Sequence, residues 1–165
     1  MNMSAFRTNL SLAIVSLLGF ATLALADGPA ALSRVEGVIV HNSSSVSSLN
    51  FVEGERSNCE LTSNGLSVTR CNLAGSSARL VSANNAEATI SFNRLSYFAT
   101  NSGNKVLHQY FYVGVWSTTL NGKSYSAPAT ITFLQYSDMD PSELRGYLTI
   151  EDFDISEQLK GTIKP

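Results

Sequence analysis

The segment from Lys105 to Tyr136 constrains the fold more than any other part of the chain. It consists of two runs in which apolar and polar residues alternate, separated by Asn121-Gly122. Asn-Gly favours a two-residue β-hairpin because a type I′ turn needs positive φ at both central positions, which Asn and Gly tolerate. We therefore predict a long antiparallel hairpin in which Leu120 lies opposite Lys123.

This register divides the hairpin into two faces, because successive side chains of a strand point to opposite sides. The first face is apolar and is typical of a core: Tyr110, Tyr112, Gly114 and Trp116 opposite Phe133, Ile131, Ala129 and Ala127. The second face is mixed: Phe111, Val113, Val115, Ser117 and Thr119 opposite Thr132, Thr130, Pro128, Ser126 and Ser124. Pro128 cannot donate to a strand ladder, so it predicts a bulge, a bend or a sheet edge.

Residues 1–26 have the pattern of a cleaved signal peptide. Arg7 provides a positive charge, Leu10 to Leu25 is apolar, and Ala24-Leu25-Ala26 provides a small-x-small cleavage site. We expect cleavage after Ala26, which leaves residues 27–165 as a single β-domain in the periplasm or extracellular space that does not span a membrane. The alternative is an uncleaved anchor, because the apolar run approaches the length of a spanning helix.

The two cysteines, Cys59 and Cys71, are expected to form a disulfide in an oxidising compartment. Asn64-Gly65 lies between them and predicts a second hairpin. A two-residue turn would place Cys59 opposite Arg70, one position from Cys71. A three-residue loop or a bulge would correct this register. The alternative, a redox-active pair, lacks the Cys-x-x-Cys spacing that lowers a thiol pKa.

The rest of the chain shows short strand patterns and no sustained helical periodicity. Asn42 to Ser48 is interpreted as a loop, and Ala74-Gly75-Ser76 as a turn between two strands. Ser137 to Glu143 is interpreted as a turn, in which Asp140-Pro141 is a candidate start for one helical turn. A change of alternation in Glu87 to Phe98 predicts a bulge at Asn93-Arg94. Further strands are predicted at Arg34–His41, Leu49–Glu53, Ala78–Ala83, Leu144–Phe153 and Ile155–Ile163.

Together these patterns predict an all-β protein of about 8–10 strands. The connections are too short for parallel crossovers, so the strands form an antiparallel meander. The long central strands favour closure into a barrel of lipocalin-like size, and a barrel-like sandwich is the alternative. An outer-membrane barrel would need more strands of about ten residues and a terminal aromatic residue, whereas this chain ends in Lys164-Pro165.

Catalytic and metal-binding motifs are weak or missing in the sequence. The weak candidate for a calcium site is the set Asp138, Asp140 and Glu143, which lacks the alternating Asp pattern of a calcium loop. No Gly-x-Ser-x-Gly elbow or phosphate loop occurs. The formal net charge of −2 and the sparse basic residues argue against a nucleic-acid partner. We therefore expect no enzyme, no catalytic residue and no cofactor.

The functional hypothesis is a non-catalytic, exported binding module. If its interior holds a small apolar ligand, the residues predicted to line it are Tyr110, Tyr112, Trp116, Ile131 and Phe133. These same side chains can instead form a packed core. Another alternative is an envelope structural or adhesion component, with an envelope protein as partner, acting through an edge strand or surface contacts. The third is an enzyme acting on envelope material, for which the acidic residues near Asp138 are the only candidates.

Overall fold

The structure is a computed structural model that describes residues 29–42, 45–63, 65–153 and 155–165. The predicted signal peptide lies outside these residues. The strands are β1 (Arg34–Asn42), β2 (Ser45–Val52), β3 (Glu55–Ser63), β4 (Ser67–Ser82), β5 (Glu87–Ser102), β6 (Lys105–Leu120), β7 (Lys123–Tyr136), β8 (Glu143–Ile150) and β9 (Ile155–Lys164). A short 3-10 turn, η1 (Glu151–Phe153), joins β8 to β9. None of the described residues forms a helix long and apolar enough to cross a membrane.

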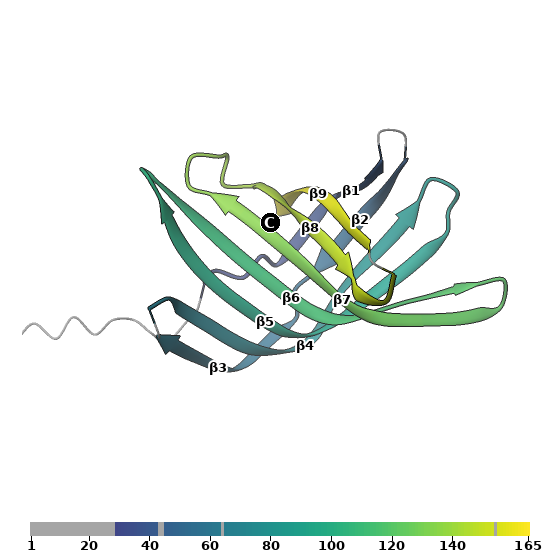
Figure 1. The fold of residues 1–165 in the computed structure, drawn as a ribbon, viewed down its shortest axis with the longest axis horizontal. Helices are drawn as coiled ribbons and strands as arrows, with labels where there is room; N and C mark the ends of the chain where they lie inside the picture. The colour runs from purple at the N-terminus through teal and green to yellow at the C-terminus, as the bar shows by residue number, and fades with distance from the viewer. Residues whose placement is uncertain (1–28, 43–44, 64, 154) are drawn as a thin grey trace, which may run out of the picture.

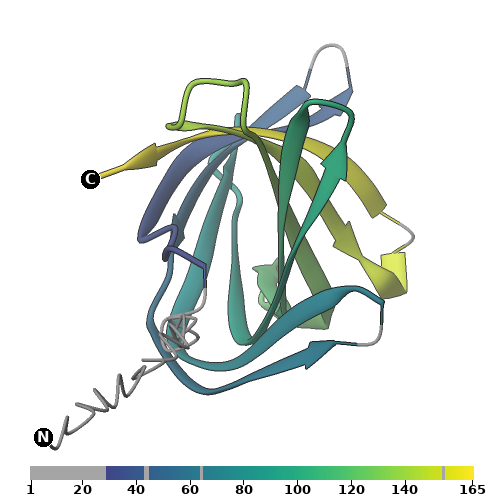
Figure 2. The same ribbon diagram turned by 90° about the vertical axis from the view of Figure 1, so that its left-hand side faces the viewer.

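Eight strands close into one antiparallel barrel (Figures 1 and 2). Consecutive strands from β4 to β9 pair in chain order, and β9 pairs with β1 from Arg34↔Lys164 to Val40↔Gln158. β1 then pairs with β2, and β2 pairs with β4. The ring is therefore complete, and the choice left open by the sequence is decided in favour of a barrel with one extra strand.

The extra strand, β3, continues the line of β2 along β4. Only Glu53 and Gly54 separate the two, and both run antiparallel to β4. β2 pairs with Ser77–Ser82, whereas β3 pairs with the earlier part of β4, from Ser67 to Ala74. The β3–β4 hairpin thus extends beyond the barrel, at the lower left of Figure 1.

The hairpin predicted from Asn121-Gly122 is confirmed in its full register. Leu120 pairs with Lys123, and the pairing continues to Leu107 with Tyr136. Asn121 and Gly122 both have positive φ, 51° and 75°. Pro128 lies one residue outside the β7–β8 pairing, which begins at Ala129, so the proline marks a sheet edge.

The predicted bulge in β5 is also confirmed. Phe92 pairs with Gly114 and Arg94 pairs with Val113, so Asn93 is the extra residue. Gly114 is required at this point because a Cβ there would overlap the Ser91 carbonyl oxygen and lie 2.8 Å from the Phe92 Cα. A glycine opposite a bulge lets the two backbones approach closely where the sheet bends.

The predicted turn at Ala74-Gly75-Ser76 is wrong. β4 runs without interruption from Ser67 to Ser82, so the two strands expected on either side of the turn are one. The left-handed φ of Gly75, 74°, is used inside the strand, where the β4–β5 register shifts between Asn72 and Ser76. Gly and Ser therefore form a bulge here instead of reversing the chain.

Three further boundaries differ from the prediction. The serine-rich segment expected to be a loop belongs to β2 from Ser45 onward, because pairing with both β1 and β4 overrides its loop-like composition. Asp140 begins a turn and not a helical turn, with its Oδ1 accepting from the Ser142 N–H at 2.8 Å. The strand predicted to end at Phe153 ends at Ile150 and continues as η1.

The core fills the barrel around four aromatic rings. Phe51, Tyr112 and Phe133 are each 0% exposed, and Phe92 packs beside them. The ring centroids of Phe51 lie 4.7 Å from Tyr112 and 5.1 Å from Phe133, in edge-to-face contacts. The centre of the barrel is therefore occupied by its own side chains.

The two ends of the barrel differ. One end, on the right in Figure 1, carries the β4–β5 and β6–β7 turns and η1; we call it the barrel mouth. At the other end, the segment Pro29–Ser33 packs against the core, with Leu32 only 2% exposed and the Glu53 N–H donating to the Ser33 carbonyl at 2.7 Å. We call this the closed end.

Candidate functional site at the barrel mouth

A pocket of about 240 Å³ opens at the barrel mouth. Its walls come from β1, β2, β4, β5, β6, β8 and β9, so it lies inside the ring of strands. The main apolar side chains of the wall are Leu80, Ala88, Trp116, Leu148, Ile150 and Ile155. The polar residues of the wall are His41, Ser47, Ser82, Glu87, Thr118 and Glu157. We call this set the mouth pocket.

The mouth pocket exists because the inward side chains become smaller toward this end of the strands. Trp116 is a large inward residue of β6, and its partner across the hairpin is the small Ala127. Ala88 on β5 pairs with Thr118, so that the next inward level also lacks a large side chain. The space above Leu148 and Ile150, which are 1% and 4% exposed, is therefore left open.

Three polar side chains form a hydrogen-bonded chain on one wall of the mouth pocket. The Nδ1 of His41 lies 2.5 Å from a Glu157 carboxylate oxygen. The Nε2 of His41 lies 2.6 Å from the Ser47 hydroxyl. If Nδ1 carries the proton and donates to Glu157, the neutral ring can only accept at Nε2, and Ser47 then donates to it.

Pairing of the first and last strands brings these residues together. Ile39 of β1 pairs with Ser47 of β2, which places Ser47 on the inward face beside the end of β1. Val40 pairs with Gln158 of β9, so that His41 follows directly alongside Glu157. Ser47 is 5% exposed, and the His41 and Glu157 side chains are 30% and 17% exposed.

The rim of the mouth is also apolar. The ring of Phe153, in η1, packs edge-on against Trp116 with 5.3 Å between centroids. The β6–β7 hairpin extends past the rim and carries Leu120 and Tyr125, which are 47% and 41% exposed. A wide, shallow depression of about 760 Å³ shares Ala88 and Leu120 with the mouth pocket and continues it outward over Ser and Thr side chains.

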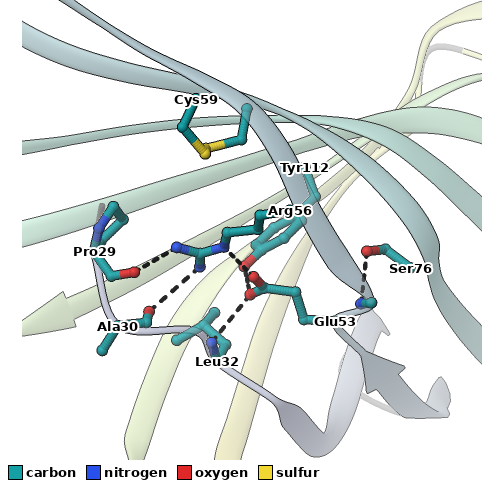
Figure 3. A network of polar contacts seen from close by, with 10 residues as sticks. Pro29, Ala30, Leu32, Glu53, Arg56, Cys59, Ser76 and Tyr112 are labelled. Atoms are coloured by element: carbon teal, nitrogen blue, oxygen red, sulfur yellow. Dashed lines mark hydrogen bonds and ion pairs between the residues drawn. A yellow bond between two sulfur atoms is a disulfide. The ribbon is translucent and has the colours of Figure 1, made fainter. Parts of the chain in front are cut away.

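A second polar cluster lies at the closed end, around the buried Glu53 (Figure 3). The Glu53 carboxylate, with a side chain 0% exposed, accepts from the Leu32 N–H at 3.0 Å and the Tyr112 hydroxyl at 2.5 Å and pairs with Arg56. Arg56 also donates to the carbonyl oxygens of Pro29 and Ala30. Burial, reinforced by the Glu53 charge, raises the pKa of Tyr112. Every group has a partner, so this cluster fastens the N-terminal segment.

The predicted ligand-lining residues separate into two groups. Tyr110, Tyr112, Ile131 and Phe133 lie in the packed core, at 4% exposure or less. Trp116 alone of the five lies at the mouth pocket.

Cys59 and Cys71 lie at bonding distance, with 2.09 Å between their sulfur atoms. Of the two register corrections considered from the sequence, the three-residue loop is the one that sets Cys59 opposite Cys71. Ser63 pairs with Ser67, which leaves a three-residue loop, and the register shifts again between Ser57 and Glu60. The pair fastens the projecting β3 to β4.

Two of the three weak calcium candidates have other partners, and no bond of the third, the Glu143 carboxylate, is seen among the described residues. Asp138 pairs with Lys105, and Asp140 accepts from both the N–H and the hydroxyl of Ser142. Within the described ranges, no group of three or more His, Cys, Asp and Glu side chains is placed to hold a metal ion. His108 pairs with Gln135 as the register predicts, and its Nδ1 lies 2.7 Å from the Tyr97 hydroxyl.

Sequence reasoning missed the His41–Ser47–Glu157 chain. Ser47 was placed in a loop, and Glu157 is far from both partners in sequence. A usable signal was present in β1. His41 lies an even number of positions from Val35 and Ile39, so it points to the same side of the strand. Both of these residues are 0% exposed, so His41 is a polar residue on the inward face. An inward-facing histidine needs buried partners, and a search for them would have led to β2 and β9.

Fold and site together define an eight-stranded antiparallel β-barrel with one closed end and a small apolar pocket at its mouth. Comparisons with protein-family models, with curated proteins and with solved structures gave no match.

Proposed function

We propose that the protein binds a small ligand in the mouth pocket, with the apolar part of the ligand against Trp116 and Leu148 and one polar group beside the chain of His41, Ser47 and Glu157. The observation that supports this proposal is a mostly apolar pocket that opens at the barrel mouth and carries a hydrogen-bonded polar chain on one wall. Ligand sites typically combine an apolar lining with a few placed polar groups. A volume of about 240 Å³ is smaller than drug-sized pockets, which indicates a ligand the size of one or two rings or a short chain.

The pocket explains more of the structure than an edge-strand function does. β3 has one edge that pairs with no described strand, which is the feature that strand addition would use. That strand, however, carries Glu55, Arg56 and Glu60, and it contains a register shift. Charged residues and bulges are the devices by which proteins protect an edge from pairing. We therefore place the function at the mouth. The signal-like residues 1–26 support placing this activity in the periplasm or outside the cell.

Quenching of Trp116 fluorescence tests the binding proposal. Trp116 is the only tryptophan of the chain, so its emission reports on this pocket alone. With 2-naphthol, an apolar bicycle with one hydroxyl group, as the probe, we expect saturable quenching. Ala88→Leu, which fills the pocket from β5, should weaken this binding at least tenfold.

Ala99→Leu is the matched control, because Ala99 lies on the same strand and is exposed. It should bind 2-naphthol as the wild type does. Unchanged melting temperatures would show that the variants are folded. The proposal fails if the folded wild type shows no saturable quenching, or if Ala88→Leu binds with wild-type affinity.

A further inference from the structure

We propose that Ser47 is a nucleophile that accepts the acyl group of small apolar carboxylic esters, with His41 as its general base and Glu157 as the residue that positions His41. This inference rests on the proposed function, because the ester must first occupy the mouth pocket. It adds a reaction and a substrate class to that binding site.

The connectivity of the three side chains supports this assignment. A hydroxyl nucleophile is activated when it donates to an imidazole nitrogen whose second nitrogen donates to a carboxylate. Here Ser47 Oγ lies 2.6 Å from His41 Nε2, and His41 Nδ1 lies 2.5 Å from the Glu157 carboxylate. The distance between Ser47 and His41 is within the range expected of a nucleophile and its base, and the distance between His41 and Glu157 is slightly shorter than that range.

The three residues also lie in the required order, with His41 at the register shift between Val40 and Asn42 of β1. They lie on three strands that are paired side by side, β2, β1 and β9. Ser47 lies in a strand that is paired on both sides, opposite Ile39 of β1 and Ser82 of β4. Sites built on such elements keep their geometry better than sites on loops.

The surroundings fit an ester and not a charged substrate. Leu80, Leu148 and Ile150 line the pocket beside the polar wall and offer an apolar surface to an acyl chain. Glu157 is already the partner of His41, and Glu87, the other carboxylate at the pocket, pairs with Arg79. A free carboxylic acid would meet two carboxylates here, whereas a neutral ester would not.

The reaction can be written with all atoms accounted for. Ser47 Oγ attacks the carbonyl carbon of the ester and forms a new C–O bond, while its proton passes to His41 Nε2. The bond from that carbon to the alcohol oxygen breaks, and the alcohol leaves with the proton from His41. Water then attacks the acyl-Ser47 ester with His41 as base, which releases the carboxylic acid and restores the serine.

The sheet limits which esters react. The backbone N–H of Ser47 belongs to a strand that is paired on both sides, so it is used in the ladder and does not stabilise an oxyanion. We therefore expect slow acylation that depends on a good leaving group, as in aryl esters. Acyl-Ser47 should accumulate, because water is a weaker nucleophile than the activated serine.

4-Nitrophenyl butyrate tests this inference on the full chain. We expect release of 4-nitrophenolate, and a butyryl group on the peptide that contains Ser47, identified by mass spectrometry. Ser47→Ala should abolish the acylation. Glu157→Gln should slow it by about 100-fold and move its pH profile, because Glu157 acts only through His41. Ser48→Ala is the matched control, since Ser48 is the next residue of β2 and points outward; it should react as the wild type does.

Binding of 2-naphthol to Ser47→Ala separates the two proposals. If Ser47→Ala binds the probe while the wild type gains no butyryl group, the nucleophile is overturned and the binding function stands. If neither binding nor acylation occurs, both are overturned. Acylation at serines other than Ser47, or an equal rate in Glu157→Gln with an unchanged pH profile, also overturns the assignment.

Discussion

Glu53 joins three parts of the barrel through one carboxylate. It binds the N-terminal segment through Leu32, the strand β3 through Arg56 and the core through Tyr112. A buried charge is tolerated only when it is paired and hydrogen-bonded, and all of these conditions are met. The stability of the closed end should therefore depend strongly on Glu53.

Replacing Glu53 by Gln should lower the free energy of unfolding by about 3 kcal/mol, because Arg56 then loses its buried counter-charge. Urea unfolding followed by circular dichroism measures this change. The double variant Glu53→Gln/Arg56→Met removes both charges and should lose less than the two single variants combined. Strict additivity, or a loss below about 0.5 kcal/mol for Glu53→Gln, would contradict this role.

At the scale of strands, the bends of the barrel depend on paired bulges and glycines. The bulge at Asn93 faces Gly114 across β5 and β6, and the β4–β5 register shift lies beside Gly54, whose added Cβ would overlap the Ala74 carbonyl oxygen. In both places a backbone passes where a side chain would otherwise lie. The curvature of these strands therefore depends on a few glycines that allow close backbone contact.

Gly114→Ala should therefore destabilise the protein by about 2 kcal/mol or more, because the new methyl group meets backbone atoms that cannot move aside. Thermal and urea unfolding measure the effect. Gly103→Asn is the control: its Cβ would meet nothing within 4 Å, and Asn tolerates the left-handed φ of 63°. An equal loss in the two variants would show that close approach is not the cause.

The sequence predicted strands well where local turn chemistry decides them. The register of β6 and β7 follows from Asn121-Gly122, and the Asn93 bulge follows from a change of alternation. It failed where distant pairing decides the outcome. The segment Ser45–Ser48 has a loop-like composition, but pairing with β1 and β4 makes it part of a strand. Gly75 is a residue type typical of turns, but here it forms a bulge.

The candidate site was less accessible to prediction than the fold. Trp116 was singled out because it lies on the inward face of the longest hairpin, and it does line the pocket. An inward aromatic side chain is packed in the core or lines a pocket according to the size of the side chains that the opposite strands place at the same height in the barrel. The contact of His41 with Glu157 requires the pairing of β1 with β9, which arises only when the barrel closes.

For the whole molecule, the enclosed tyrosines predict a loss of stability in alkali. Burial raises the pKa of Tyr110 to about 12 and raises that of Tyr112 further. An unfolded tyrosine ionises near pH 10. The unfolded chain therefore releases these protons first, so that the stabilisation is complete below about pH 10 and is lost as pH rises toward 12.

For Tyr110 alone this shift corresponds to about 2 to 3 kcal/mol, and Tyr112 adds to it. Urea unfolding between pH 8 and pH 12 should show the decline, and Tyr110→Phe should make it shallower. A free energy of unfolding that stays constant to pH 12, or ionisation of all tyrosines near pH 10 in the folded protein by absorbance, would contradict the burial of these hydroxyl groups.

The closed end has a consequence for how the mouth pocket exchanges its contents. Leu32 and the aromatic core block one side, so a ligand bound as proposed above and its replacement would use the same opening. A molecule that arrives cannot displace the occupant from behind, and it must wait until the opening is clear. The rate of release is then a property of the occupied protein alone, independent of how much competitor is present, and the rim of Trp116 and Phe153 governs both arrival and departure.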